Sequence, residues 1–84
     1  MNQESQIQVF GAMWCVDCRR SKRFLEDHGI PFKWHDVSVD AVAMALVQKL
    51  NGGMKSIPTI VFLDGTVLIE PSDRELAKKL GVTV

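Results

Sequence analysis

The alternation of hydrophobic and polar positions predicts two elements at the start of the chain. A short β-like run spans residues 7–10 (IQVF), and Gly11 ends it. From Val16 to about His28 the pattern becomes helical, because opposite charges recur four residues apart and apolar side chains share one face. Gly29, shortly before a proline, is a typical helix stop. The pattern therefore predicts a strand followed by a helix.

The middle of the chain repeats this order. Residues 32–37 alternate loosely, as a strand does, and residues 41–50 are nearly all apolar and rich in helix formers. Either Ser38 or Asp40 is suited to cap this second helix, and the Asn-Gly-Gly of residues 51–53 closes it.

The last third predicts a hairpin and a final helix. Residues 59–63 (TIVFL) are β-branched and apolar, as is typical of a central strand. The Asp-Gly pair at 64–65 predicts a two-residue hairpin turn, after which residues 66–69 return as the partner strand. Residues 72–75 (SDRE) form the capping-box pattern S-x-x-E, and Gly81 ends the helix that follows.

The predicted order is β-α-β-α-β-β-α. Its first half implies a parallel strand pair with a right-handed crossover, and its second half an antiparallel hairpin. We expect an α/β fold with a four-stranded mixed sheet and helices on both faces. The chain has 84 residues, and we expect residues 1–84 to form a single domain.

Composition narrows the classes of function. The chain is 46% hydrophobic and its formal net charge is zero, which argues against disorder and against a basic field for nucleic acid. Its longest apolar stretch, residues 41–47, is too short to span a membrane, and the polar N-terminus MNQESQIQ does not resemble a signal peptide. We expect a small, soluble cytoplasmic protein that acts as a monomer.

The two cysteines, Cys15 and Cys18, carry the clearest chemical signal. A disulfide between them closes too short a loop to stabilise the fold much, so the pair is better explained by chemistry. Cys15 falls where a strand leads into a helix, and the helix N-terminus favours its thiolate. Cys18 follows one turn later on the same side, where it can attack a mixed disulfide formed at Cys15. Cys15 is therefore the expected nucleophile and Cys18 the resolving thiol.

A zinc site is the alternative for a C-x-x-C pair, with His28 and His35 as the remaining ligands. His28, however, lies near the far end of the helix that begins at the cysteines, at roughly 15 Å for ten residues. His35 is predicted to lie within a strand. Packing or surface roles are the simpler interpretation of both histidines, and no bound metal is expected.

Charged and aromatic residues surround the pair. The basic run of residues 19–23 is best explained as a solvated helix face, although Arg19 and Arg20 could attract an anionic thiol substrate or an acidic partner. The negative charge of Asp17 disfavours a thiolate, because a like charge raises the pKa of a thiol. A proton relay to Cys18 is another role open to Asp17. Trp14 is expected to be exposed on one side and to shape a docking surface. Proline is tolerated at the first position of a strand, as at Pro58. These residues do not determine whether the peptide bond before Pro58 is cis or trans.

Several of these motifs together resemble the glutaredoxins of the thioredoxin-fold superfamily, and more specifically the mycoredoxins and related bacterial proteins. They are the C-V-D-C at the first helix, the S-I-P of residues 56–58, the D-G hairpin, and the N-G-G and P-S pairs of the stretch from residue 50 to 80. The resemblance covers about residues 6–80.

The resemblance implies a set of roles. Cys15 would attack and Cys18 would resolve, with Pro58 in the cis form beside the dithiol. The backbone of Ile57 would pair with a bound thiol substrate, and Trp14 would border the groove. Ser72 and Asp73 would hold a carboxylate of that substrate at the start of the last helix.

Two departures bear on the substrate. Glutathione-using glutaredoxins usually carry C-P-Y-C, whereas this chain has no Pro or Tyr between its cysteines. They also usually carry a Gly-Gly pair before the last helix, where this chain has Glu70-Pro71-Ser72. Pro71 lacks an N–H, so one backbone donor to the substrate is lost. These differences weaken the case for glutathione, and leave mycothiol, another small thiol or a thioredoxin-type reductase as the reductant.

The sequence thus predicts a dithiol–disulfide oxidoreductase that reduces protein disulfides or mixed disulfides with a low-molecular-weight thiol. It would serve electron transport and cell redox homeostasis through its redox-active disulfide. One alternative is an iron–sulfur protein in which two chains each donate Cys15 to a cluster. Another is an electron donor that depends on thioredoxin reductase. We expect no tightly bound cofactor, no nucleic-acid partner and no membrane partner.

Overall fold

A computed structural model describes residues 6–84; the expectation about the first residues, MNQESQIQ, falls mostly outside this range. The elements follow the predicted order. They are, in chain order, β1 (Ile7–Gly11), α1 (Val16–Asp27), β2 (Phe32–Asp36), α2 (Ala41–Leu50), β3 (Thr59–Val61), β4 (Val67–Ile69) and α3 (Asp73–Leu80).

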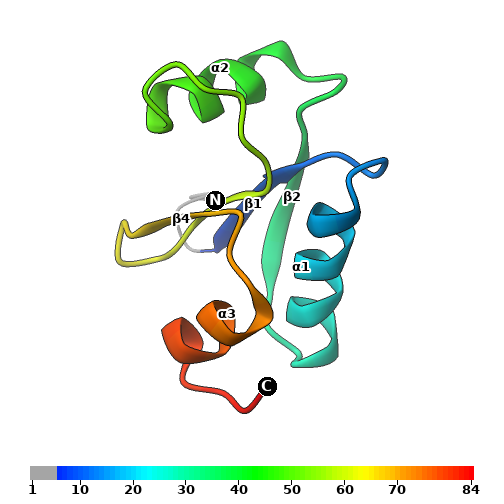
Figure 1. The fold of residues 1–84 in the computed structure, drawn as a ribbon, viewed down its shortest axis with the longest axis vertical. Coiled ribbons are helices and arrows are strands. Elements are labelled where there is room, and N and C mark those ends of the chain that lie inside the picture. Colours follow the sequence, from blue (N-terminus) through cyan, green and yellow to red (C-terminus); the bar gives the residue numbers. More distant parts are fainter. Residues whose placement is uncertain (1–5) are drawn as a thin grey trace.

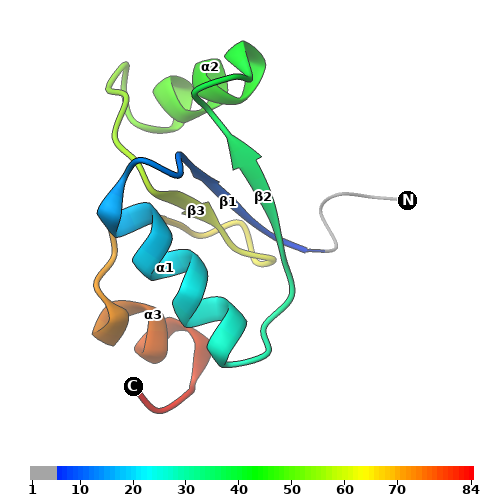
Figure 2. The same cartoon turned by 90° about the vertical axis from the view of Figure 1, so that its right-hand side faces the viewer.

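The strands form one mixed sheet in the order β2-β1-β3-β4. β1 runs parallel to β2 and antiparallel to β3, and β3 is antiparallel to β4. The sheet separates two helical layers, with α2 on one face and α1 and α3 on the other (Figure 1, Figure 2). The expected α/β architecture is confirmed.

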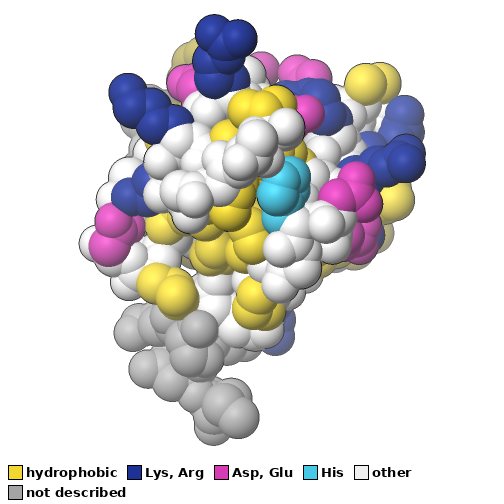
Figure 3. All heavy atoms as spheres, turned by 90° about the horizontal axis from the view of Figure 1, so that it is seen from below, with side chains coloured by type: hydrophobic (Ala, Val, Ile, Leu, Met, Phe, Trp, Pro, Cys, Tyr) yellow, Lys and Arg dark blue, Asp and Glu magenta, His cyan; other side chains and the backbone are white. Residues whose placement is uncertain are grey.

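Two hydrophobic clusters fill the space between the sheet and its helices. Successive residues of β1 pack into different clusters, because successive side chains of a strand point to opposite faces of the sheet. Val9 packs with Leu25 of α1 and Leu76 of α3, whereas Phe10 packs with Val47 of α2. From the side on which α3 lies, hydrophobic side chains fill the centre of the view and Lys and Arg project around it (Figure 3).

Local signals account for the helix ends. Asp40 caps α2 and accepts a hydrogen bond from the Ala43 N–H, which decides between the two predicted caps. Ser72 and Glu75 form the predicted capping box of α3. Gly29 follows α1 with a φ of +66°, a conformation that glycine adopts without strain.

The hairpin turn is longer than the sequence predicts. β3 ends at Val61, and the Phe62 N–H donates to the Thr66 carbonyl at 2.8 Å, which encloses residues 63–65. A two-residue type I′ turn needs positive φ at both central positions. Gly65 has a φ of +85°, but Asp64 is not among the positive-φ residues. The prediction of a two-residue turn at 64–65 was therefore wrong.

Candidate active site

Cys15 lies at the junction between the β1 loop and α1. Its N–H donates to the Ala12 carbonyl at 3.1 Å, which closes a tight turn after β1. Cys15, a partly exposed residue, is the N-cap of α1, and its sulfur accepts a hydrogen bond from the Cys18 N–H at 3.3 Å. The sulfur therefore occupies the helix N-terminus, where the helix dipole stabilises negative charge.

Cys18 lies in the first turn of α1 and is completely buried. Burial, together with its hydrogen bond to Cys15, raises the pKa of the Cys18 thiol to about 12. Both cysteines are free thiols. The site thus combines an accessible sulfur with a buried, protonated partner one turn away.

Pro58 lies at the same end of the sheet as the dithiol. The antiparallel register pairs Phe10 with Thr59, which places the preceding residue, Pro58, beside Gly11. Gly11 in turn faces Cys18. The Ile57–Pro58 peptide bond is cis, as the resemblance implies. Pro58 is buried, and its carbonyl accepts the Glu70 N–H at 2.8 Å. Ile57, half-buried, leads into this bond.

The residues expected to hold a substrate carboxylate begin α3. Ser72 is the N-cap of this helix, and Asp73 is its first residue. Arg20 of α1 connects them to the dithiol helix, since its guanidinium donates to Asp73 at 2.5 Å and to the Pro71 carbonyl at 2.9 Å. The structure therefore brings the start of α3 next to α1, although Arg20 and Asp73 are fifty-three residues apart in the sequence.

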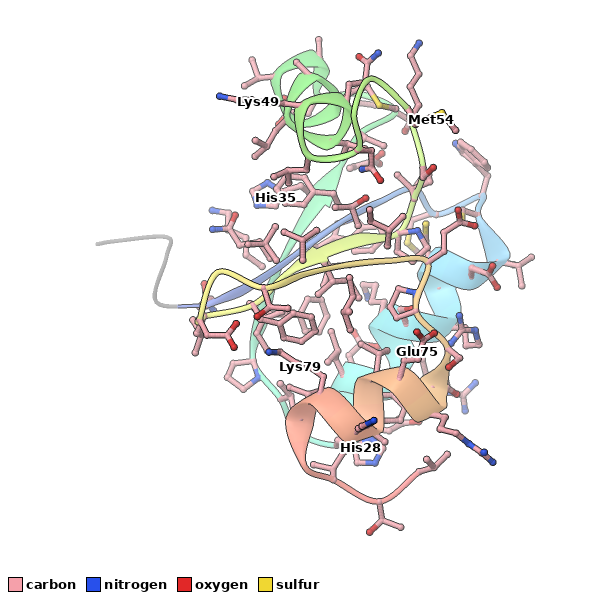
Figure 4. The ribbon with its side chains drawn as sticks, turned by 60° about the vertical axis from the view of Figure 1, so that its left-hand side comes forward. His28, His35, Lys49, Met54, Glu75 and Lys79 are labelled. Atoms are coloured by element: carbon pink, nitrogen blue, oxygen red, sulfur yellow. The ribbon has the colours of Figure 1, made fainter. Side chains whose placement is uncertain are left out.

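Large apolar side chains are exposed near the ends of these segments. Trp14 is 71% exposed, as predicted, and its neighbours Met13 and Val16 are exposed as well. Met54, in the segment between α2 and Pro58, is also exposed and appears beyond the end of α2 in Figure 4. Met13 and Met54 were not among the predicted site residues, because the only signal in the sequence is an apolar residue in a loop.

The charged residues of α1 divide into two groups. Lys22 pairs with Glu26, and Arg23 pairs with Asp27, which confirms the solvated helix face. Arg20, by contrast, lies 3.7 Å from Asp17 as well as contacting Asp73. Asp17 thus has an arginine partner, and the relay role suggested for it stays a prediction.

Both histidines are held by contacts outside the dithiol. The two ring nitrogens of His28 hydrogen-bond to the carbonyls of Phe24 and Thr83, at 2.9 and 2.8 Å. His35 stacks on Phe10, and its Nε2 lies 2.7 Å from the Gln8 amide oxygen. Among residues 6–84, no group of three or more His, Cys, Asp and Glu side chains is arranged to hold a metal ion.

Comparison with known proteins identifies the family of this chain. The glutaredoxin family model matches residues 7–68, from β1 through the cis-proline segment and into β4. The chain belongs to the glutaredoxin family. Family membership supports a role in thiol–disulfide oxidoreduction.

The relatives and a solved structure extend the match over most of the chain. A protein of Mycobacterium tuberculosis that carries the name glutaredoxin is 32% identical over 74 residues, 88% of each chain. Mycoredoxin 1 of Corynebacterium glutamicum is 29% identical over 76 residues, 90% of this chain and 94% of that one. A mutant of a thioredoxin-like protein superposes with a TM-score of 0.81 at 27% identity, covering 93% of this chain and 97% of its own. The fold of this glutaredoxin is thus thioredoxin-like.

Within the part of the chain that is described, none of the helices has the length and hydrophobicity to cross a membrane.

Proposed function

We propose that this glutaredoxin is a dithiol–disulfide oxidoreductase in which Cys15 attacks and Cys18 resolves. The observation that carries the proposal is the asymmetry of the two thiols. Cys15 is accessible at the N-terminus of α1, whereas Cys18 is buried, protonated and hydrogen-bonded to it. A substrate can reach only the first sulfur, and the second is in place for an intramolecular step.

The reaction consists of two exchanges. The Cys15 thiolate attacks one sulfur of a substrate disulfide, forming a mixed disulfide while the other substrate thiolate leaves and takes up a proton. Cys18 then loses its proton and attacks the Cys15 sulfur, so that the Cys15–Cys18 disulfide forms and the second substrate thiol is released. The substrate gains two electrons, and the dithiol loses them.

The oxidised protein must then be reduced. Two molecules of a low-molecular-weight thiol can do this, the first forming a mixed disulfide at Cys15 and the second leaving with it as the small disulfide. Mycothiol or glutathione would be such a co-substrate, and a thioredoxin-type reductase is the alternative. In this proposal Trp14, Ile57 and Pro58 border the bound thiol, and disulfide-containing proteins are the substrates.

Reduction of the oxidised protein by three separate systems tests the proposal. Glutathione, mycothiol, and thioredoxin reductase with NADPH are each added while tryptophan fluorescence is followed. Rapid reduction by a small thiol supports the proposed cycle, whereas reduction by the reductase alone would make the protein a thioredoxin-like electron donor.

Single substitutions test the two cysteine roles. Cys15→Ser should abolish thiol transfer, while Cys18→Ser should retain exchange that needs one thiol. Activity in Cys15→Ser would contradict the assignment. Visible absorbance in anaerobically purified protein would instead favour a cluster held by Cys15 of two chains.

A further inference from the structure

The N-terminus of α3 is closed by a carboxylate of its own helix. The Ser72 N–H donates to the Glu75 side chain at 2.9 Å, and the Glu75 N–H donates to the Ser72 hydroxyl at 3.1 Å. Figure 4 shows Glu75 in the first turn of α3, close to the segment that follows β4. The backbone donor of Ser72, where a substrate carboxylate was expected, is thus already occupied.

The two nearby arginine side chains, Arg19 and Arg20, also already have partners within the chain. Arg20 donates to Asp73 and to the Pro71 carbonyl, and it lies 3.7 Å from Asp17. Arg19 donates to the Met13 carbonyl at 2.6 Å. Neither arginine can turn to an incoming anion without losing contacts within the chain.

The charge of the segment also opposes an anion. Residues 70–75 hold three acidic residues, Glu70, Asp73 and Glu75, and one basic residue, Arg74, so their net charge is −2, and Pro71 supplies no N–H. The N–H groups of Asp73 and Arg74 belong to the same turn as two of these carboxylates. The positive end of the α3 dipole, which would attract an anion, is therefore offset by the helix's own acidic residues.

We infer that this end of the site discriminates against small thiols that carry carboxylates, and that Glu75 determines this specificity. The inference rests on the proposed function. The favoured co-substrate is a thiol whose polar groups are neutral hydroxyls and amides. Such groups carry no charge for the acidic turn to repel, whereas a carboxylate meets like charge.

The test compares two mixed disulfides of one peptide, made with glutathione or with the neutral thiol N-acetylcysteamine. In each reaction the Cys15 thiolate attacks the small thiol's sulfur, the original S–S bond breaks, and the peptide thiolate leaves and is protonated. The rate of peptide release is measured for the wild type and for Glu75→Gln, which removes the charge but keeps a capping-box side chain.

Glu75→Gln should speed the reaction of the glutathione disulfide about threefold, the effect of one like charge roughly 7 Å away in water. The reaction of the neutral disulfide should not change, and salt near 1 M should remove the difference between the variants. Glu26→Gln is the matched control, because it removes the same charge from the Lys22 pair on α1. It should leave the ratio of the two rates unchanged.

Two results would overturn the inference. Equal rate ratios in wild type and Glu75→Gln, with both disulfides reacting, would show that Glu75 does not select the thiol and would leave the proposed function intact. Failure of both disulfides to react in any variant would refute the proposed function, and the selectivity with it.

Discussion

The bare α-carbon of Gly11 faces the sulfur of Cys18. A β-carbon at Gly11 would lie 2.9 Å from the Cys18 sulfur and 3.0 Å from its β-carbon, with the Trp34 ring also at 3.0 Å. Real β-carbons do not approach other atoms so closely in ordinary packing. The absence of a side chain at the end of β1 is therefore what allows the resolving thiol to pack against the sheet.

Gly11→Ala should destabilise the protein and displace Cys18. Overpacking of a buried contact costs about 1–3 kcal/mol, and urea unfolding can measure the loss. The displacement should also slow the closing of the Cys15–Cys18 disulfide, while attack by Cys15 alone is less affected. In a Cys18→Ala background the cost should fall, because the sulfur is gone. An equal cost in both backgrounds would show that the Cys18 sulfur is not the obstacle, because Cys18→Ala keeps the β-carbon.

Alkylation should distinguish the two thiols. Burial raises the pKa of the Cys18 thiol to about 12, so this thiol stays protonated at pH 7, and its buried side chain is also inaccessible to reagents. Iodoacetamide should therefore add once to the native reduced protein, at Cys15, and twice after unfolding in urea. Intact-mass and peptide mass spectrometry check this. Comparable native rates at both cysteines would contradict the asymmetry on which the proposed mechanism rests.

Much of the fold could be predicted because its signals are local. The capping box of Ser72 and Glu75 and the stop at Gly29 each depend on residues a few positions apart, and both are present. The C-x-x-C likewise needed only a strand-to-helix junction to indicate redox chemistry. The elements and the dithiol were therefore accessible from the sequence.

The remaining features depend on contacts between distant segments. Gly11 was interpreted as the end of a strand, which is correct, but its contact with Cys18 requires the packing of α1 against β1. The pairing of Arg20 with Asp73 joins two helices whose relative position no local pattern encodes. The length of the hairpin turn was missed because it depends on the φ of Asp64, which the Asp-Gly pair alone does not fix.

Ser21→Ala should stabilise the protein. Ser21 is completely buried in α1, and its hydroxyl oxygen is the one buried side-chain polar atom without a hydrogen-bond partner in the described chain. A buried hydroxyl that loses water without gaining a partner costs about 1–3 kcal/mol, and alanine is also the better helix former. Urea unfolding should show a gain of about 1 kcal/mol. Ser72→Ala, which removes a cap in use, should show a loss of similar size.

His28 should make stability depend on pH. Its ring nitrogens face two backbone carbonyls, Phe24 and Thr83, so both bonds require the doubly protonated ring. These two hydrogen bonds raise the pKa of His28, and the nearby charges of Asp27 and Asp73 act in the same direction.

A raised pKa means that the folded protein binds the proton more tightly than the unfolded chain does. The stabilisation from His28 is then fully present below the ordinary histidine pKa near 6.5 and is lost as pH rises through the raised value. His35 acts in the opposite sense, because burial lowers its pKa and its contribution is lost as pH falls. The comparison of wild type with His28→Gln isolates the first effect, since His35 is common to both. The difference in Tm should be largest near pH 5.5 and shrink toward pH 8.5, and a difference that does not change with pH would show that the ring is held without its second proton.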